Sequence, residues 1–194
     1  MLVFLIHVRD PQFYALPAKT RAKNGRIRVM GLPPTGIMSL SSVLKRSGHE
    51  CVMIDHAHPE TPNEFIIEEI KRRKPALVGL SFLSTTSYPY AKILARQIRA
   101  ADSTVKLAFG GVFASLNAGL VKLQCPEIDF VCRGDGEQLL LDLLDRLEDP
   151  QEVGGVTWAK DGKVINTPNR TMESHLDQWP YPDRESLELD FVES

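Results

Sequence analysis

The chain has 194 residues, 43% of them hydrophobic, and a formal net charge of −2 at pH 7. A chain of this length and apolar content can form one large α/β domain with a sizeable core and a tail. The nearly balanced charge gives no reason to expect a nucleic acid or another polyelectrolyte as a partner.

The chain begins with an apolar run at residues 2–8, which predicts a first buried strand. This run is too short for a membrane span and lacks the basic flank of a signal peptide. Cys51, Cys125 and Cys132 are unevenly spaced, and two of them lie in apolar, strand-like segments. This pattern favours buried thiols over a disulfide framework or a metal cluster. We therefore expect a soluble cytoplasmic protein.

Apolar runs alternate with amphipathic segments, which is the pattern of right-handed β-α-β units. Strands are predicted at residues 2–8, 51–55, 76–82, 105–109 and 128–132. Helices are predicted at residues 37–46, 62–73, 86–101, 113–123 and 137–147. This order predicts an α/β, flavodoxin-like (Rossmann-like) fold with a parallel five-stranded sheet in the order 2-1-3-4-5. In such a sheet a ligand binds where strands one and three diverge.

The pattern changes after residue 149. Residues 155–159 and 163–166 flank Asp161-Gly162, which predicts a small β-hairpin with a tight turn. From residue 167 onward, prolines, acidic residues and isolated aromatics occur without periodicity, which indicates a linker. We expect a domain at residues 1–149, a hairpin at 150–167 and a linker at 168–194.

Two signals mark the ends of neighbouring strands. Ser81-Phe82-Leu83 ends the third predicted strand, and Gly110-Gly111 follows the fourth. Glycines let a ligand approach the backbone, and the hydroxyls of Ser81, Ser84 and Thr85 can exchange hydrogen bonds with it. A second interpretation is that the glycines form a strand-to-helix turn and the hydroxyls cap the next helix.

Longer segments resemble the cobalamin-binding domain that precedes the barrel of cobalamin-dependent radical S-adenosylmethionine enzymes. They read PPTGIM at 33–38, GHE at 48–50, PALVGLS at 75–81, FGGV at 109–112, EIDFVCRGDGE at 127–137 and LDQWPYPD at 176–183. The resemblance implies a set of cofactor-binding residues and no catalytic or metal-ligating residue. The cofactor-binding residues would be Pro34, Thr35, Gly36, Ser81, Leu83, Ser84, Thr85, Gly110, Gly111, Val112, Gly134, Gly136 and Glu137.

The sequence departs from the better-known cobalamin carriers, whose D-x-H-x-x-G motif supplies a histidine to cobalt. Gly31 stands in the place of the aspartate and Pro33 in that of the histidine. Proline cannot ligate a metal. The resemblance therefore implies a base-off cobalamin, with its nucleotide tail displaced into the sheet crevice and no protein histidine on cobalt.

The resemblance further implies that the chain is the N-terminal domain of a radical S-adenosylmethionine enzyme, a methyltransferase using methylcobalamin. Some relatives of this family catalyse cyclisation or ring rearrangement instead. S-adenosylmethionine and a [4Fe-4S] cluster would bind in a downstream domain of the same polypeptide. This chain lacks the C-x-x-x-C-x-x-C motif for that cluster, since no third cysteine accompanies Cys125 and Cys132.

Two other classes of α/β domain need residues that this chain lacks. A response-regulator receiver needs an aspartate at the end of strand three, where this chain has Ser81, and a dinucleotide-binding domain needs G-x-G-x-x-G after strand one. Neither is present. A flavodoxin-like, flavin-binding electron-transfer module remains the alternative on fold alone, although it would have a hydroxyl-rich loop directly after strand one.

Three segments keep two interpretations each. In residues 133–137, Asp135 and Glu137 either border the ligand or cap the following helix, with Arg133 solvated. The basic stretch from Arg9 to Met30 is either a lid over the crevice or a solvated loop. His56 and His58 lack the further ligands of a metal site and predict a polar loop, whereas His7 is expected to be a partly buried, hydrogen-bonding histidine.

Overall fold

A computed structural model describes residues 1–9, 34–56, 61–171 and 176–186. Seven strands form one sheet in the order β2-β1-β3-β4-β5-β6-β7. The strands are β1 (Leu2–His7), β2 (Glu50–Asp55), β3 (Leu77–Ser81), β4 (Lys106–Gly110), β5 (Phe130–Cys132), β6 (Val156–Lys160) and β7 (Lys163–Asn166). The first five are parallel, which confirms the predicted order 2-1-3-4-5, and the β6–β7 hairpin continues the sheet antiparallel to β5.

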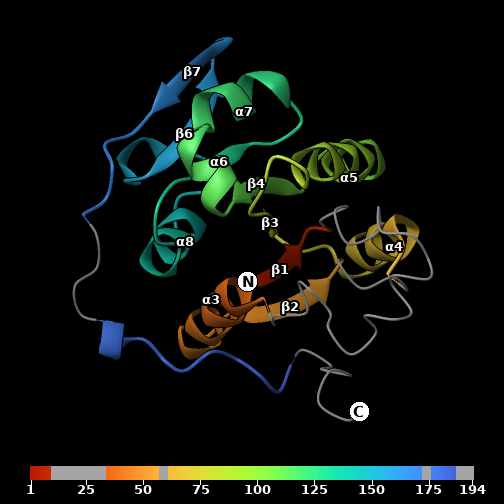
Figure 1. The fold of residues 1–194 in the computed structure, drawn as a ribbon, viewed down its shortest axis with the longest axis vertical. Coiled ribbons are helices and arrows are strands. Elements are labelled where there is room, and N and C mark those ends of the chain that lie inside the picture. Colours follow the sequence, from red (N-terminus) through yellow and green to blue (C-terminus); the bar gives the residue numbers. More distant parts are fainter. Residues whose placement is uncertain (10–33, 57–60, 172–175, 187–194) are drawn as a thin grey trace.

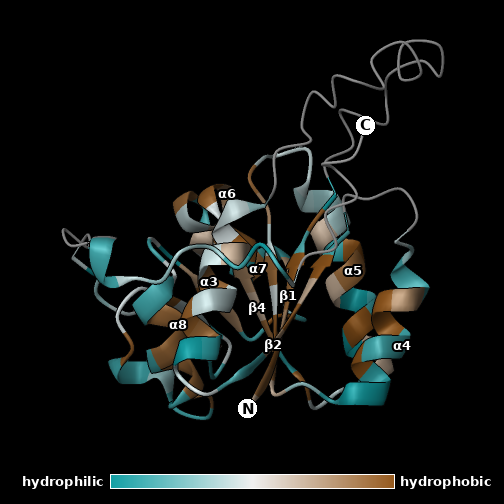
Figure 2. Cartoon of the chain, turned by 90° about the horizontal axis from the view of Figure 1, so that it is seen from below, coloured by the Kyte–Doolittle hydropathy of each residue, from teal (hydrophilic) through white to brown (hydrophobic). Residues whose placement is uncertain are grey.

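Helices cover both faces of the sheet (Figures 1 and 2). They are α3 (Thr35–Arg46), α4 (Asn63–Arg73), α5 (Tyr88–Ala101), α6 (Val112–Leu116), α7 (Ala118–Gln124) and α8 (Glu137–Leu144), with short 3-10 turns at Pro150–Glu152 and Leu176–Gln178. One core lies between the sheet and α4, α5, α6 and α7, and a second core lies between the sheet and α3 and α8. Because helices shield both faces, the strands are apolar along their length rather than alternating.

The predicted helix at residues 113–123 is wrong in its continuity, because the structure divides this region into α6 and α7 at Asn117. The Asn117 side-chain amide donates a hydrogen bond to the carbonyl oxygen of Phe113 at 2.9 Å. Asparagine competes for backbone groups in this way and so favours a helix end over a helix interior. By contrast, the predicted D-G turn is confirmed, since Asp161 (φ 50°) and Gly162 (φ 73°) both adopt the left-handed conformation of a type I′ hairpin.

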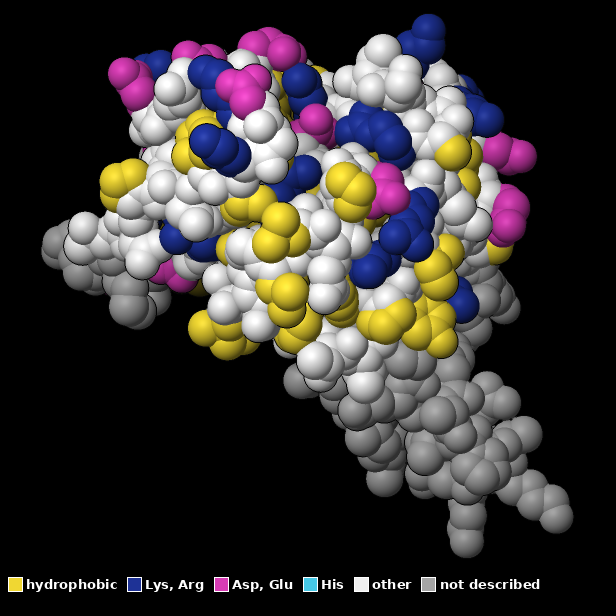
Figure 3. Space-filling model, turned by 90° about the horizontal axis from the view of Figure 1, so that it is seen from above, with side chains coloured by type: hydrophobic (Ala, Val, Ile, Leu, Met, Phe, Trp, Pro, Cys, Tyr) yellow, Lys and Arg dark blue, Asp and Glu magenta, His cyan; other side chains and the backbone are white. Residues whose placement is uncertain are grey.

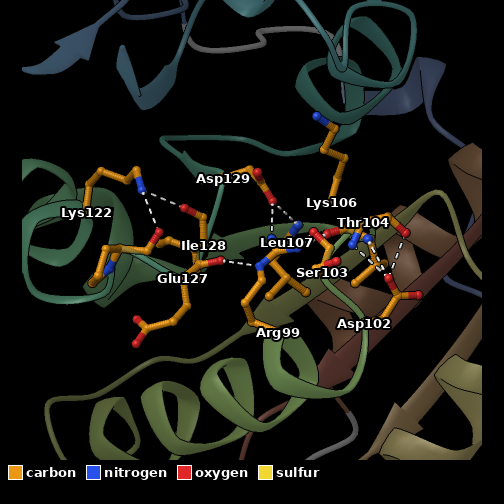
Figure 4. Close-up of polar contacts among 12 residues, drawn as sticks. Arg99, Asp102, Ser103, Thr104, Lys106, Leu107, Lys122, Glu127, Ile128 and Asp129 are labelled. Carbon is orange, nitrogen blue, oxygen red and sulfur yellow. Dashed lines mark hydrogen bonds and ion pairs between the residues drawn. The ribbon is translucent and has the colours of Figure 1, made fainter. Parts of the chain in front are cut away.

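A polar network fixes the amino ends of the central strands (Figure 4). Arg99 of α5 donates hydrogen bonds to the carbonyl oxygens of Glu127 at 3.0 Å and Val105 at 2.8 Å. It also bonds Asp129 Oδ2 at 2.7 Å, and the same oxygen accepts the N–H of Leu107 at 2.8 Å. These charge-assisted bonds hold α5, β4 and the loop before β5 together at the edge opposite to the carboxyl ends of the strands.

The segment at residues 176–186 lies along α3 (Figure 1). The Asp183 N–H donates to the carbonyl oxygen of Met38 at 3.0 Å, and Asp183 Oδ2 accepts bonds from Ser41 at 2.7 Å and Lys45 at 2.6 Å. Arg46 lies over the Trp179 ring at 5.5 Å from its centroid. The end of the described chain is therefore attached to α3.

We expect Asp183→Asn to lower the free energy of unfolding by about 2 kcal/mol at pH 7. Burial raises the pKa of Asp183, but the hydrogen bonds from Lys45, Ser41 and Ser186 outweigh it and hold the pKa at about 2. A depressed carboxylate pKa stabilises the fold above pH 4, and this contribution is lost as the pH falls towards 2. Urea unfolding at pH 7 and pH 2.5 measures the effect, with the exposed Asp177→Asn as the control. Equal stability of Asp183→Asn and the unmodified chain at pH 7 would contradict it.

Candidate functional site

A cavity of about 250 Å³ lies between the sheet and helices α3 and α8, at the carboxyl ends of the central strands. It is lined by Leu5, Gly36, Ile37, Leu40, Gly79, Leu80, Ser81, Ala108, Phe109, Gly110, Gly111, Cys132, Gly134, Asp135, Gly136, Glu137, Leu139 and Leu140. This position is the expected ligand site of an open α/β sheet.

Small residues lie in the middle of two strands that border the cavity. Leu5, Gly79 and Ala108 lie side by side in the register of β1, β3 and β4. Two residues further along, on the same face, Ser81 pairs with Gly110 at the strand ends. Central parallel strands normally carry bulky aliphatic residues here. A Cβ at Gly79 would lie 3.1 Å from Leu5 Cδ2, so the Leu5 side chain fills the space over Gly79, and the small side chain of Ala108 leaves the room on this face of the sheet.

The glycine that ends β4 and the glycine after it have different functions. A Cβ added at Gly110 would meet no atom within 4 Å, so the absent side chain leaves open space in the cavity. Gly111 has φ 93°, and a Cβ there would lie 2.3 Å from the carbonyl oxygen of Phe82. Gly110 therefore opens the cavity, whereas Gly111 allows two backbone segments to approach each other.

A hydrogen bond between two helices borders the cavity. Ser39 Oγ of α3 donates to Glu137 Oε1 of α8 at 2.8 Å. A Cβ at Gly136 would lie 3.0 Å from a methyl carbon of Leu40, so the glycine lets α8 begin close to α3. The wall formed by α3 is thus tied to the wall formed by α8.

The predicted site residues fall into two groups. Those that line the cavity are Gly36, Ser81, Gly110, Gly111, Gly134, Gly136 and Glu137. Those outside its lining are Pro34, Thr35, Leu83, Ser84, Thr85 and Val112. Leu83 and Val112 are 59% and 58% exposed. Each lies two residues after the end of its strand, β3 or β4, and so at the carboxyl edge of the sheet, near the cavity.

The hydroxyl cluster lies in the turn that precedes α5. Ser84 Oγ accepts a hydrogen bond from the backbone N–H of Ser87 at 3.2 Å, just before α5 begins, and it also bonds Thr86 Oγ1 at 2.7 Å. The second interpretation of this cluster, a cap of the next helix, is wrong, because the N-cap of α5 is Ser87 and no side chain forms a cap hydrogen bond there. Ser81 differs, because its hydroxyl lines the cavity and has no hydrogen-bond partner within the described ranges.

Two expectations for residues 133–137 are wrong. Asp135 does not cap α8, because the N-cap is Gly136 and no side-chain cap bond is formed. Arg133 is not simply solvated, since it donates hydrogen bonds to the carbonyl oxygen of Thr167 and the side chain of Asn169 beyond the hairpin. Glu137 does lie in the first turn of α8. Arg133 therefore links the turn after β5 to the end of the hairpin.

Sequence reasoning missed more than half of the residues that line the cavity. The residues it did not select are Leu5, Ile37, Leu40, Gly79, Leu80, Ala108, Phe109, Cys132, Asp135, Leu139 and Leu140. Most of them are aliphatic and indistinguishable by type from ordinary core residues. The available signal was the presence of Gly79 and Ala108 in the middle of strands that otherwise carry large side chains.

His7 and His56 differ in their surroundings. His7 Nδ1 lies 3.2 Å from Asp55 Oδ1, with the His7 side chain 22% exposed, which confirms a partly buried, hydrogen-bonding histidine. His56, predicted in a polar loop, is instead buried at 2% exposure. Burial and then the positive charge of Arg9 lower the pKa of His56 to about 4. Residues 57–60, including His58, and residues 10–33, including Gly31 and Pro33 and nearly all of the basic stretch, lie outside the described residues.

The free energy of unfolding should therefore depend on the protonation of His56 in the weakly acidic pH range. A histidine whose pKa is lowered by folding stabilises the native state above pH 6.5, and this stabilisation is lost as the pH falls to 4. We expect the free energy of unfolding to decrease by about 3 kcal/mol over this interval because of His56. Chemical denaturation across pH 7 to 4 should show that His56→Gln lacks this component and that His49→Gln retains it. A His56→Gln chain with an unchanged pH profile would refute the assignment.

The chemistry of the cavity is that of a binding site. Burial raises the pKa of the Cys132 thiol to about 12, so the thiol stays protonated at neutral pH. In the part of the chain that the structure describes, no three His, Cys, Asp or Glu side chains are grouped closely enough to hold a metal ion.

None of the described helices is long and apolar enough to cross a membrane. In Figure 3 the hydrophobic side chains gather over the middle and lower part of the face, and most acidic side chains lie along its rim.

Comparison with known proteins adds an independent line of evidence. Residues 29–144 match the family model of the B12 binding domain. The chain is 31% identical over 84% of its length to an uncharacterized methyltransferase, PH0819, of Pyrococcus horikoshii, covering 36% of that protein. It is 28% identical over 80% of its length to an anaerobic magnesium-protoporphyrin IX monomethyl ester cyclase of Synechocystis, covering 32% of it. The chain thus spans about a third of the length of these curated relatives.

Among solved structures, the fold is similar to that of the cobalamin-dependent S-adenosylmethionine radical enzyme OxsB with aqua-cobalamin bound. The TM-score is 0.71 at 20% identity, over 94% of this chain and 24% of that one. At this identity the likeness establishes the fold and not the details of the site.

Proposed function

Because the chain belongs to the family of B12-binding domains, we propose that the cavity between α3 and α8 holds the nucleotide tail of cobalamin, displaced from cobalt. The observation that carries this proposal is the position of the cavity at the carboxyl edge of the sheet, where Ser81, Gly110 and the start of α8 line it together. A volume of about 250 Å³ accommodates a bicyclic base with part of its ribose. The corrin ring is much wider and has to remain outside.

The residues present fit such a group. Gly110 leaves open space where any side chain would fill the entrance, and the neighbouring wall carries only the small side chain of Ala108. The Ser81 hydroxyl can donate a hydrogen bond to a ring nitrogen of the base, and Glu137 can accept one from the ribose. The corrin would then lie over the exposed side chains of Leu83 and Val112 at the edge. This placement would give two of the predicted residues outside the cavity, Leu83 and Val112, a contact with the corrin.

The absence of a protein ligand to cobalt belongs to the same proposal. Of the described histidines near this edge, His7 faces Asp55 and His56 is buried. Neither lines the cavity. We propose that Ser81, Gly110 and the α8 entrance hold cobalamin by its tail, and that the chain supplies no imidazole to the metal.

We further propose that this domain serves a radical S-adenosylmethionine enzyme that transfers methyl groups. Bound cobalamin supplies a cobalt centre that can carry a methyl group. The relative named as a methyltransferase supports methyl transfer, and the relatives named as cyclases show that related chains carry other assigned reactions. In this proposal residues 1–149 bind the cofactor, residues 150–167 form the hairpin, and residues 168–194 lead to a domain with S-adenosylmethionine and a [4Fe-4S] cluster.

The test is retention of cobalamin by the purified chain. The chain is mixed with hydroxocobalamin, desalted, and its visible spectrum recorded, with FMN in a parallel trial. We expect cobalamin to be retained near one equivalent with the spectrum of the base-off form, and FMN to be removed. Removal of cobalamin with retention of FMN would overturn the proposal in favour of a flavin-binding module.

A further inference from the structure

The cavity changes in polarity along its length. Its outer end carries the Ser81 hydroxyl and the carboxylates of Asp135 and Glu137. Its inner end is formed by Leu5, Gly79, Ala108, Leu139 and Leu140. None of these inner residues has a side chain that donates or accepts a hydrogen bond.

The backbone of the strands supplies no partner at the inner end either. Leu5, Gly79 and Ala108 lie on β1, β3 and β4, and each of these strands pairs with neighbours on both sides. Their N–H and C=O groups therefore take part in the ladders of the sheet. On the side of the sheet, a ligand atom that reaches this depth meets hydrocarbon only.

The orientation of a nucleotide in the cavity follows from its connections. The ribose and phosphate are polar and must join the corrin outside, so they occupy the outer end near Ser81 and Glu137. The edge of the base furthest from the ribose enters the apolar end. The chemistry of that edge decides whether burial is favourable.

Resting on the function proposed above, we propose that Leu5, Gly79, Ala108, Leu139 and Leu140 select corrinoids whose lower base is an alkylated benzimidazole over those whose lower base is adenine. A dimethylbenzimidazole presents two methyl groups at its far edge, and these gain free energy by burial. Adenine has a similar size but presents an amine and a ring nitrogen there. Both would lose their hydrogen bonds to water without replacement.

The test compares the affinities of the purified chain for hydroxocobalamin and for its adenine-containing analogue, each measured by equilibrium dialysis. Leaving one or two polar groups unsatisfied predicts a preference for the benzimidazole form of about 10- to 100-fold. Equal affinities, or tighter binding of the adenine form, would overturn the selectivity but leave the proposed function standing. Failure of both corrinoids to bind would overturn the proposed function, and this inference with it.

Matched serine variants locate the selectivity within the cavity. Ala108→Ser places one hydroxyl at the inner end with almost no change in volume, and we expect it to narrow the preference by about 3- to 10-fold. Ala91→Ser makes the same change at a buried position of α5, on the other face of the sheet, and should leave the preference unchanged. An unaltered preference in a folded Ala108→Ser chain, checked by circular dichroism, would overturn the assignment to these residues.

Discussion

Replacing Gly110 with leucine is expected to weaken cobalamin binding by about 100-fold or more without unfolding the chain. The added side chain would project into open space, because no atom lies within 4 Å of its Cβ position. The variant would therefore fold without a clash at this position, and its leucine side chain would occupy the volume that the nucleotide needs. Forcing such an overlap costs on the order of 3 kcal/mol, and each 1.4 kcal/mol is a factor of ten in affinity.

The matched control is Gly119→Leu on α7, where an added Cβ likewise meets nothing within 4 Å but the residue does not line the cavity. Its affinity should equal that of the unmodified chain. Circular dichroism and a thermal melt establish that both variants fold. If Gly110→Leu bound cobalamin normally, or if Gly119→Leu lost as much affinity, the cavity would not be the binding site.

Gly111→Ala is expected to destabilise the fold by about 3 kcal/mol or more. An alanine at φ 93° is strained, and its Cβ would lie 2.3 Å from the carbonyl oxygen of Phe82. Gly111 has φ 93° and ψ 174°, a region that essentially only glycine adopts, so the strain costs on the order of 1–3 kcal/mol, and the displacement of backbone adds about 1–3 kcal/mol. The free energy of unfolding from urea titration measures the sum.

Gly48→Ala separates the two causes. Gly48 also has a positive φ, 80°, but a Cβ there meets nothing within 4 Å. This variant should lose only about 1 kcal/mol, the cost of the backbone conformation alone. Comparable losses for Gly48→Ala and Gly111→Ala would show that the contact with Phe82 is relieved at little cost.

The sheet and its order could be predicted from the sequence because they depend on a repeated pattern. Five apolar runs separated by amphipathic helices permit few topologies, and the structure has the expected one. The break between α6 and α7 could not be predicted from periodicity, since it depends on one side-chain bond from Asn117. The contact of residues 176–186 with α3 could not be predicted for the same reason, because it depends on single residues such as Asp183.

The site was only partly predictable. The strand ends at Ser81 and Gly110 were found because polar and glycine residues interrupt apolar runs at those points. The inner end of the cavity was not found, since Leu139 and Leu140 are residue types that occur in the core of any helix-containing protein. Gly111 was found for an incomplete reason: its neighbour is the Phe82 backbone, and only the packed structure shows that contact.

The measurement that tests the central claim most directly compares cobalamin with cobinamide, which has the corrin ring but no nucleotide tail. Equilibrium dialysis of the unmodified chain gives both dissociation constants under the same conditions. If the cavity between α3 and α8 holds the tail, cobalamin should bind at least about 10-fold more tightly, because burying the base stabilises the complex by more than 1.4 kcal/mol. Equal affinities would contradict the account, since the tail would then contribute nothing to binding.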